Sequence, residues 1–348
     1  AAAAAANWEQ QWNELITAAR QEGKLVVSGP PTPETRKTLP EKFKERFGFE
    51  LEYFAPGNTA DLLNRMEGER ASGLYTVDVI IGGAQSLYYQ AYEAKILEPV
   101  KPVIFHPEAT DPTKWVNGKM WFMDPEQQYI LRLGNYLTNH IVVNTDSVKP
   151  EAIKTWQDMI DPKYRGKISV YEPIITGSGW NTANYLWKKL GDDFIRKLYV
   201  DQQPAVSRDF RQLSDWTARG TYPITLGLRE AEIDALRKDG FPIAVVSPPT
   251  DVAIPVSAGF GLAVLINNAP HPNASKLFLN WIATREGQEA WHQAEKTVSV
   301  RTDVDNSWAA AYAKPQPGMQ FFDTYDWDYT RASRNPAELD KLKQLIGR

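Results

Sequence analysis

The stretch KLVVSGPPT at residues 24–32 shows how the chain is built. Residues 24–28 form a short apolar run with the length of a buried strand, and residues 29–31 form a loop. Thr32 followed by Pro33 is typical of a helix cap and the first helical position. A strand, a loop and a helix are therefore expected in succession.

The same order continues on both sides of this stretch. Its signals are helical spacing of Trp8, Trp12 and Leu15, a strand over 51–54, a helix capped by Asn58 with Leu62, Leu63 and Met66 inward, a strand over 77–81, and a helix starting near Ser86. Strands that alternate with helices predict a largely parallel sheet with helices on both faces. In such sheets, ligands bind beyond the carboxyl ends of the strands.

A second α/β series is expected after residue 136. The predicted strands cover 141–144, 168–171, 224–227, 243–246 and 257–266; the predicted helices cover about 179–190, 192–200 and 208–219, with one more starting at Asn273. We find no internal repeat at a fixed period. The 348 residues are thus expected to form two α/β regions.

Composition excludes several function classes. The chain has no cysteine, which removes disulfides, thiolate metal sites and thiol nucleophiles. The net charge is −4 and no long Lys/Arg block occurs, so we expect no nucleic-acid partner. No apolar run reaches the roughly 20 residues that span a bilayer. We expect that any signal peptide has been removed, and we set Ala1–Ala6 aside.

No catalytic constellation is visible in the sequence. The four histidines are scattered, and the HExxH, Walker A and GxSxG patterns do not occur. We therefore predict that the protein is not an enzyme and uses neither a cofactor nor a metal. A periplasmic hydrolase with paired carboxylates is the distant alternative.

Five stretches resemble one family in the same order along the chain. They are GKLVVSGPP at 23–31, VDVIIGGAQS at 77–86, TWQDMIDPKYRGKISVYEPIITGSG at 155–179, ARGTYPITLG at 218–227 and HPNASKLFLNWIATREGQEA at 271–290. They are similar to the bacterial extracellular solute-binding proteins of the ferric-iron, spermidine/putrescine, thiamine and phosphonate group, which serve ABC importers. The resemblance implies a two-lobed, type II periplasmic-binding-protein fold, in which each lobe is a mixed, mostly parallel sheet flanked by helices.

The resemblance also implies an organisation and a setting. We expect hinge crossings near residues 135 and 253, with one lobe formed by 1–135 plus 254–305 and the other by 136–253 plus 306–348. The implied setting is the periplasm, or the cell exterior with a membrane tether. A small-molecule ligand and the membrane permease of an ABC importer are the implied partners, and we expect a monomer without membrane insertion.

The loop before residue 180 is the leading candidate for ligand contact. Thr176, Gly177, Ser178 and Gly179 precede an apolar helix, and a helix N-terminus offers unpaired amides and partial positive charge to an anion. Ser178 capping its own helix is the alternative. Trp180 adjoins this loop as a candidate cleft wall, although a core position is the other interpretation.

Further candidates follow other predicted strands. They are Ser28 and Gly29, Gln85 and Ser86, and the aromatic residues Tyr129 and Tyr171. Ordinary turn chemistry is the alternative for the polar residues, and a core position is the alternative for the aromatic ones.

Arg229 and Glu230 decide the expected solute. In iron-binding members this region carries two adjacent tyrosines, whereas this chain reads Leu228-Arg229-Glu230-Ala231. A guanidinium binds carboxylate or phosphate in forked geometry, although Arg229 on a solvated helix face is the alternative. We therefore expect capture of a small anionic organic solute, phosphorylated or carboxylated, by lobe closure. Ferric iron is the alternative ligand.

Overall fold

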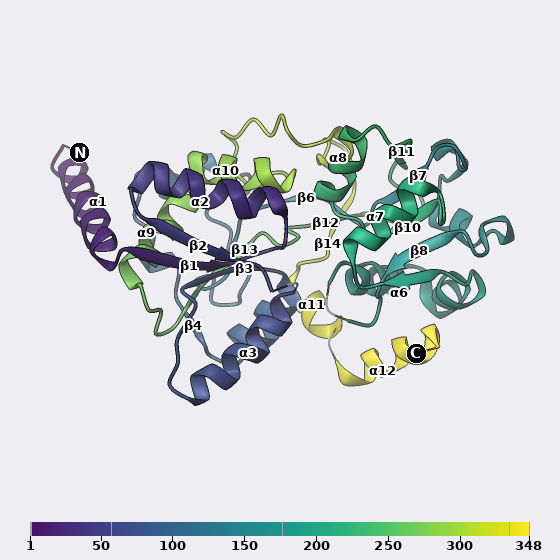
Figure 1. Ribbon diagram of the computed structural model, residues 1–348, viewed down its shortest axis with the longest axis horizontal. Helices are drawn as coiled ribbons and strands as arrows, with labels where there is room; N and C mark the ends of the chain where they lie inside the picture. Colours follow the sequence, from purple (N-terminus) through teal and green to yellow (C-terminus); the bar gives the residue numbers. More distant parts are fainter. Residues whose placement is uncertain (1, 57, 176, 334, 348) are drawn as a thin grey trace. The chain divides into compact units, whose positions relative to one another are not determined.

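The computed structural model describes residues 2–56, 58–175, 177–333 and 335–347. The chain divides into two compact units (Figure 1). Unit 1 contains residues 1–135 and 258–309, and unit 2 contains residues 136–257 and 310–348. The predicted hinge crossings stay a prediction.

Unit 1 is built from a mixed sheet and helices. Its elements are α1 (Ala2–Glu22), β1 (Lys24–Ser28), α2 (Pro33–Phe47), β2 (Glu50–Phe54), α3 (Thr59–Ala71), β3 (Val79–Gly82), α4 (Ala84–Ser86), the π-helical η1 (Leu87–Tyr92), β4 (Leu97–Glu98), η2 (Lys101–Val103), α5 (Pro107–Thr110), η3 (Pro112–Lys114), β5 (Leu131–Arg132), β13 (Leu262–Ile266), α9 (Pro272–Ile282) and α10 (Arg285–Glu295). The sheet order is β2-β1-β3-β13-β4, with β5 also paired to β13.

Parallel pairing in unit 1 brings three carboxyl strand ends to one edge. β1 pairs in parallel with β2 and β3, whereas β13 is antiparallel to β3. α2 and α10 lie on one face of this sheet and α3 lies on the other (Figure 1). The inward face of α2 carries Phe43 and Phe47, both fully buried against Trp281 of α9. Full burial of one such side chain contributes about 1.5–3 kcal/mol.

Unit 2 repeats the α/β pattern with different connections. Its elements are β6 (Tyr136–Leu137), β7 (Ile141–Asn144), η4 (Pro150–Ala152), η5 (Trp156–Ile160), η6 (Pro162–Tyr164), β8 (Ile168–Tyr171), α6 (Ser178–Arg196), η7 (Lys197–Asp201), β9 (Ala205–Ser207), α7 (Phe210–Arg219), β10 (Ile224–Leu226), α8 (Glu230–Lys238), β11 (Ile243–Val245), β12 (Ile254–Ser257), η8 (Ala311–Ala313), β14 (Phe321–Asp323), α11 (Trp327–Ser333) and α12 (Pro336–Ile346). The main sheet order is β11-β7-β10-β8-β9, and β14-β12-β6 form a small second sheet.

Most predicted elements are confirmed. β1, β7 and β8 have the predicted bounds, and Asn58 caps α3 by accepting from the Asp61 amide at 2.8 Å. The predicted break between residues 190 and 192 is the non-helical Gly191 inside α6. Thr32 takes the cap position of α2, but its hydroxyl donates to Glu295 at 3.0 Å and does not cap the helix.

One predicted strand is wrong. The apolar run 257–266 is not a single strand, because β12 ends at Ser257 and β13 begins at Leu262. Between them Gly259 has φ +57°, in the left-handed region, and the chain turns there. The two strands belong to different units.

Candidate functional site

The carboxyl edge of the main sheet in unit 2 brings several predicted site residues together. β8 runs parallel to β9 and β10, and Val170 pairs with Leu226 while Tyr171 pairs with Ser207. The loops that follow these strands therefore lie side by side. Tyr171 ends β8 at this edge, and the loops lead to the start of α6 at 177–180 and to residues 229–230 at the start of α8.

A glycine cap begins α6 at this edge. Gly177 has φ +142° and ψ −164°, a backbone conformation that side chains rarely adopt, and it has no side chain to accept from the first amides of the helix. Those amides and the helix dipole favour an anion. Thr176, also predicted for this site, lies outside the described residues.

The first turn of α6 packs tightly on β8. A Cβ atom at Gly179 would lie 2.3 Å from the Glu172 carbonyl oxygen and 2.4 Å from the Tyr171 carbonyl oxygen, so only glycine fits. The Ser178 hydroxyl donates to the Gly227 carbonyl at 3.1 Å. Ser178 is the first residue of the helix and Gly177 is its cap, so the interpretation of Ser178 as the cap is wrong.

Trp180 is the next residue of α6 and is 1% exposed within the hydrophobic core of unit 2. This environment corresponds to the core interpretation of the residue. Contact between Trp180 and a solute stays a prediction.

An aromatic and cationic stack occupies the same edge. The rings of Tyr171 and Phe210 are stacked with centroids 4.6 Å apart, and the Arg229 guanidinium carbon lies 4.3 Å from the Phe210 centroid. Arg229 Nε donates to Glu232 Oε2 at 2.9 Å, and Arg229 Nη2 donates to Glu232 Oε1. The Arg229 side chain is only 12% exposed, so it does not lie on a solvated helix face.

Glu230, predicted beside Arg229, is buried and faces a histidine. Its Oε1 lies 3.0 Å from His140 Nε2, and the ring of Tyr312 meets the His140 ring edge-on at 4.9 Å. After β8 and β9, the buried Glu172 pairs with the exposed Arg208 at 3.5 Å. The acidic groups at this edge therefore have basic neighbours from adjacent strands.

Burial raises the pKa of the Tyr171 phenol, and the nearby Arg229 charge opposes that rise. The phenol is therefore held in its protonated form, as a hydrogen-bond donor and acceptor.

In unit 1, Ser28 and Gly29 lie at the carboxyl ends of parallel strands. Ser28 pairs with Phe54 of β2 and Ile80 of β3, and it is 2% exposed. The Gly29 amide donates to the Phe54 carbonyl at 3.1 Å. A Cβ atom at Gly29 would lie 2.3 Å from the Tyr53 hydroxyl oxygen, so glycine permits this close approach.

The other predicted residues of unit 1 follow β3 or lie in a later loop. Gln85 and Ser86 form α4 with Ala84, and both are buried. Tyr129 is half-buried and meets the Tyr92 ring edge-on at 5.5 Å. Desolvation, with Glu126 nearby, raises the pKa of the Tyr129 phenol. Solute contact for these residues stays a prediction.

A comparison with known protein families covers most of the chain. The model of the bacterial extracellular solute-binding proteins matches residues 38–316. The chain belongs to this family. Solute-binding proteins of this family capture small molecules for ABC importers, work with the importer permease and carry out no chemical step. None of the helices in the described ranges combines the length and apolar character that a membrane crossing needs.

Similar proteins place this solute-binding protein in a known fold. An uncharacterized protein of Haemophilus influenzae is 25% identical over 339 residues, which are 94% of this chain and 92% of that protein. The solved periplasmic binding protein AfuA from Actinobacillus pleuropneumoniae, with exogenous fructose-6-phosphate bound, has a TM-score of 0.67 at 19% identity and covers 93% of this chain and 97% of its own. Apo ferric ion-binding protein A of Pasteurella haemolytica has a TM-score of 0.68 at 13% identity, over 93% and 98%. The predicted type II fold is confirmed.

The histidines of this solute-binding protein have partners within the fold. His292 lies between the Thr297 hydroxyl at 2.7 Å and the Leu133 carbonyl at 2.8 Å, and burial lowers its pKa to about 4. His271 Nδ1 lies 2.8 Å from an Asp78 oxygen, and His106 packs edge-on against a tryptophan ring. Among the described residues, His, Asp and Glu side chains form no group of three or more that is placed to hold a metal ion.

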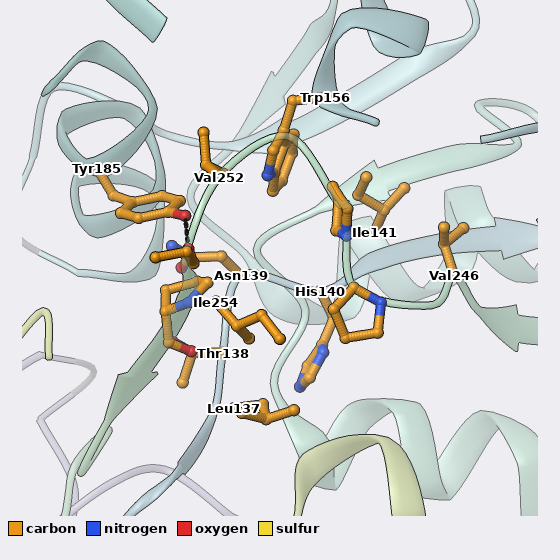
Figure 2. Close-up of a pocket in the computed structure, with 14 residues that line it drawn as sticks. Leu137, Thr138, Asn139, His140, Ile141, Trp156, Tyr185, Val246, Val252 and Ile254 are labelled. Atoms are coloured by element: carbon orange, nitrogen blue, oxygen red, sulfur yellow. Dashed lines mark hydrogen bonds between the residues drawn. The ribbon is translucent and has the colours of Figure 1, made fainter. Parts of the chain in front are cut away.

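Unit 2 of the solute-binding protein also contains a narrow pocket of about 20 Å³, the size of a water molecule (Figure 2). Residues from the segments 137–141 and 246–255 line it, together with Trp156 and Tyr185. The Tyr185 hydroxyl donates to the carbonyl of Ala253 (Figure 2). None of the predicted site residues that the structure describes lines this pocket, and we assign no solute to it.

Proposed function

We propose that this solute-binding protein captures a small anionic organic solute, phosphorylated or carboxylated, for an ABC importer. The negative group binds the first amides of α6, and closure of the two lobes encloses the solute. The observation that supports this proposal is the glycine cap of α6 at the edge where Arg229 is held. We also propose that the protein acts as a monomer, in the periplasm or tethered outside the cell.

The chemistry of this edge favours anions. Backbone N–H groups and a guanidinium are donors without acceptor capacity, so they pair with phosphate or carboxylate oxygens. The similar protein AfuA was solved with fructose-6-phosphate bound, which makes sugar phosphates the first solutes to test.

Ferric iron is the second candidate, because apo ferric ion-binding protein A has a similar fold. Tyrosine binds ferric ion as phenolate, and the pKa of Tyr171 and that of Tyr129 are both raised, which opposes deprotonation before the metal arrives. A ferric–tyrosinate protein is coloured, so the absorption spectrum after incubation with ferric citrate separates the two candidates.

A thermal-shift panel tests the proposal. The panel contains inorganic phosphate, fructose-6-phosphate and citrate, with fructose and putrescine as neutral and cationic controls. A solute at 100 times its Kd adds about 2.7 kcal/mol of stability, which raises the unfolding temperature. We expect a shift with at least one anion and none with the controls. Stabilisation by putrescine alone would contradict the proposal.

Two variants at one residue test the role of the α6 amides. Ser178→Pro removes an amide N–H at the first helical position, where proline is tolerated. Ser178→Ala is the matched control, since it removes the hydroxyl and keeps the N–H. A lost hydrogen bond to a charged group costs about 1.5–3 kcal/mol, so we expect the proline variant to bind at least tenfold more weakly than the alanine variant. Equal affinities would show that this amide does not contact the solute.

A further inference from the structure

Phe210 lies at the centre of the stack at the edge of unit 2. It is the first residue of α7, after the cap Asp209, which accepts from the Arg211 amide at 2.8 Å. The Tyr171 ring is stacked on Phe210 at an interplanar angle of 23°, and the Arg229 guanidinium lies over the Phe210 ring. Phe210 therefore contacts both Tyr171 and Arg229 through its ring.

This arrangement restricts Arg229 from two directions. The Glu232 carboxylate accepts hydrogen bonds from Arg229 Nε and Nη2, and it also accepts from the Arg229 backbone amide at 3.2 Å. These three bonds fix the position of the guanidinium. The Phe210 ring also holds the guanidinium in place, through dispersion and the attraction between a cation and an aromatic ring. An arginine side chain that is already ordered loses less conformational entropy when a solute binds.

We propose that Phe210 is a positioning residue for solute recognition, which orients Arg229 and Tyr171 at the carboxyl edge of β8, β9 and β10. The inference rests on the proposed function, in which Arg229 contacts the anionic group. Since Glu232 balances its charge, Arg229 acts through the direction of its N–H groups. The solute therefore presents a planar or tetrahedral oxyanion that accepts directed hydrogen bonds.

A double-mutant cycle between positions 210 and 229 tests this inference. Phe210→Leu removes the aromatic face, Phe210→Tyr keeps it, and Arg229→Met removes the guanidinium. Isothermal titration calorimetry gives Kd for inorganic phosphate and for citrate with each variant and with Phe210→Leu/Arg229→Met. Phe241→Leu is the matched control, because Phe241 is an exposed phenylalanine of the same unit at 42% exposure.

We expect Phe210→Leu to raise Kd by about threefold to tenfold, the size of a cation–aromatic interaction. Phe210→Tyr and Phe241→Leu should leave Kd near the wild-type value. In the Arg229→Met background, Phe210→Leu should have little further effect, because the group that it positions is absent. A residue that only stabilises the fold would not show this coupling.

Additive effects of the two changes would overturn the inference while leaving the proposed function standing. A wild-type protein that binds neither phosphate nor citrate would instead overturn the proposed function, and the inference with it. Thermal unfolding of each variant verifies folding. If Phe210→Leu does not fold, Phe210→Met replaces it, because methionine also lacks the aromatic face. The same cycle with Arg229→Met is then measured, and additive effects on Kd again overturn the inference.

Discussion

Replacing Gly179 by alanine tests whether the first turn of α6 must lie against β8. The added Cβ atom would lie 2.3 Å from the Glu172 carbonyl oxygen, whereas a carbon–oxygen contact needs about 3.3 Å, so the helix start must move by about 1 Å. Both nearby oxygens belong to the backbone and cannot rotate away. Overpacking of this kind costs about 3 kcal/mol, and the better helix propensity of alanine offsets about 1 kcal/mol. We expect a net loss of about 2 kcal/mol.

Urea unfolding followed by tryptophan fluorescence measures the loss. The matched control is Gly68→Ala in α3, where a Cβ atom meets nothing within 4 Å and the exposed helix should gain about 1 kcal/mol. A displacement of about 1 Å would also misplace the amides of α6, so Gly179→Ala should weaken phosphate binding. Wild-type stability of Gly179→Ala would refute the reasoning, because the contact that requires glycine would not exist.

Three other predictions concern the stability of unit 1. Asp78→Ala should cost about 3 kcal/mol in urea unfolding, because the buried carboxylate accepts the backbone amide and ring N–H of His271; a loss below about 1 kcal/mol would contradict this network. Gly29→Ala should lower the unfolding temperature, because the added Cβ atom clashes with the Tyr53 side chain. Adding Tyr53→Leu should restore part of the lost unfolding temperature. If it restores none, the clash is not with Tyr53. The pKa of His292 is about 4 in the folded protein, whereas its ordinary value is 6.5. Because the unfolded chain binds the extra proton between these values, roughly 3 kcal/mol of stability is lost as pH falls from 6.5 to about 4. The His292→Gln variant should show a flatter pH dependence of unfolding.

Elements bounded by strong local signals could be predicted from the sequence. β1 and β8 are short apolar runs, and β1 is closed by the Gly-Pro-Pro loop. Gly191 correctly divides the helical region after residue 178. The run 257–266 could not be divided this way, because it is almost continuously apolar and only the tertiary pairing of β12 and β13 assigns its halves to separate sheets.

The candidate site was predictable only in part. The glycines at 177 and 179 pointed to the start of α6 because close backbone approach leaves a local composition signal. Phe210 carried no such signal, since its stack joins residues at the ends of three different strands, β8, β9 and β10. The three-residue spacing of Arg229 and Glu232 at a helix start is a local pattern that could have indicated their ion pair.

Under the proposed function, the charges at the carboxyl edge of unit 2 make the direction of the donors more important than net charge. Arg229 is balanced by Glu232, Glu172 by Arg208, and Glu230 lies against His140. With the side-chain charges paired among themselves, the donors proposed for the solute are the first amides of α6 and the N–H groups of Arg229, which donate hydrogen bonds and do not accept them. A polyamine would bring further donors to these donors, whereas an oxyanion brings acceptors. The proposed selectivity for an anion would therefore follow from the sheet and helix geometry that orients these donors, without requiring an excess of positive side chains.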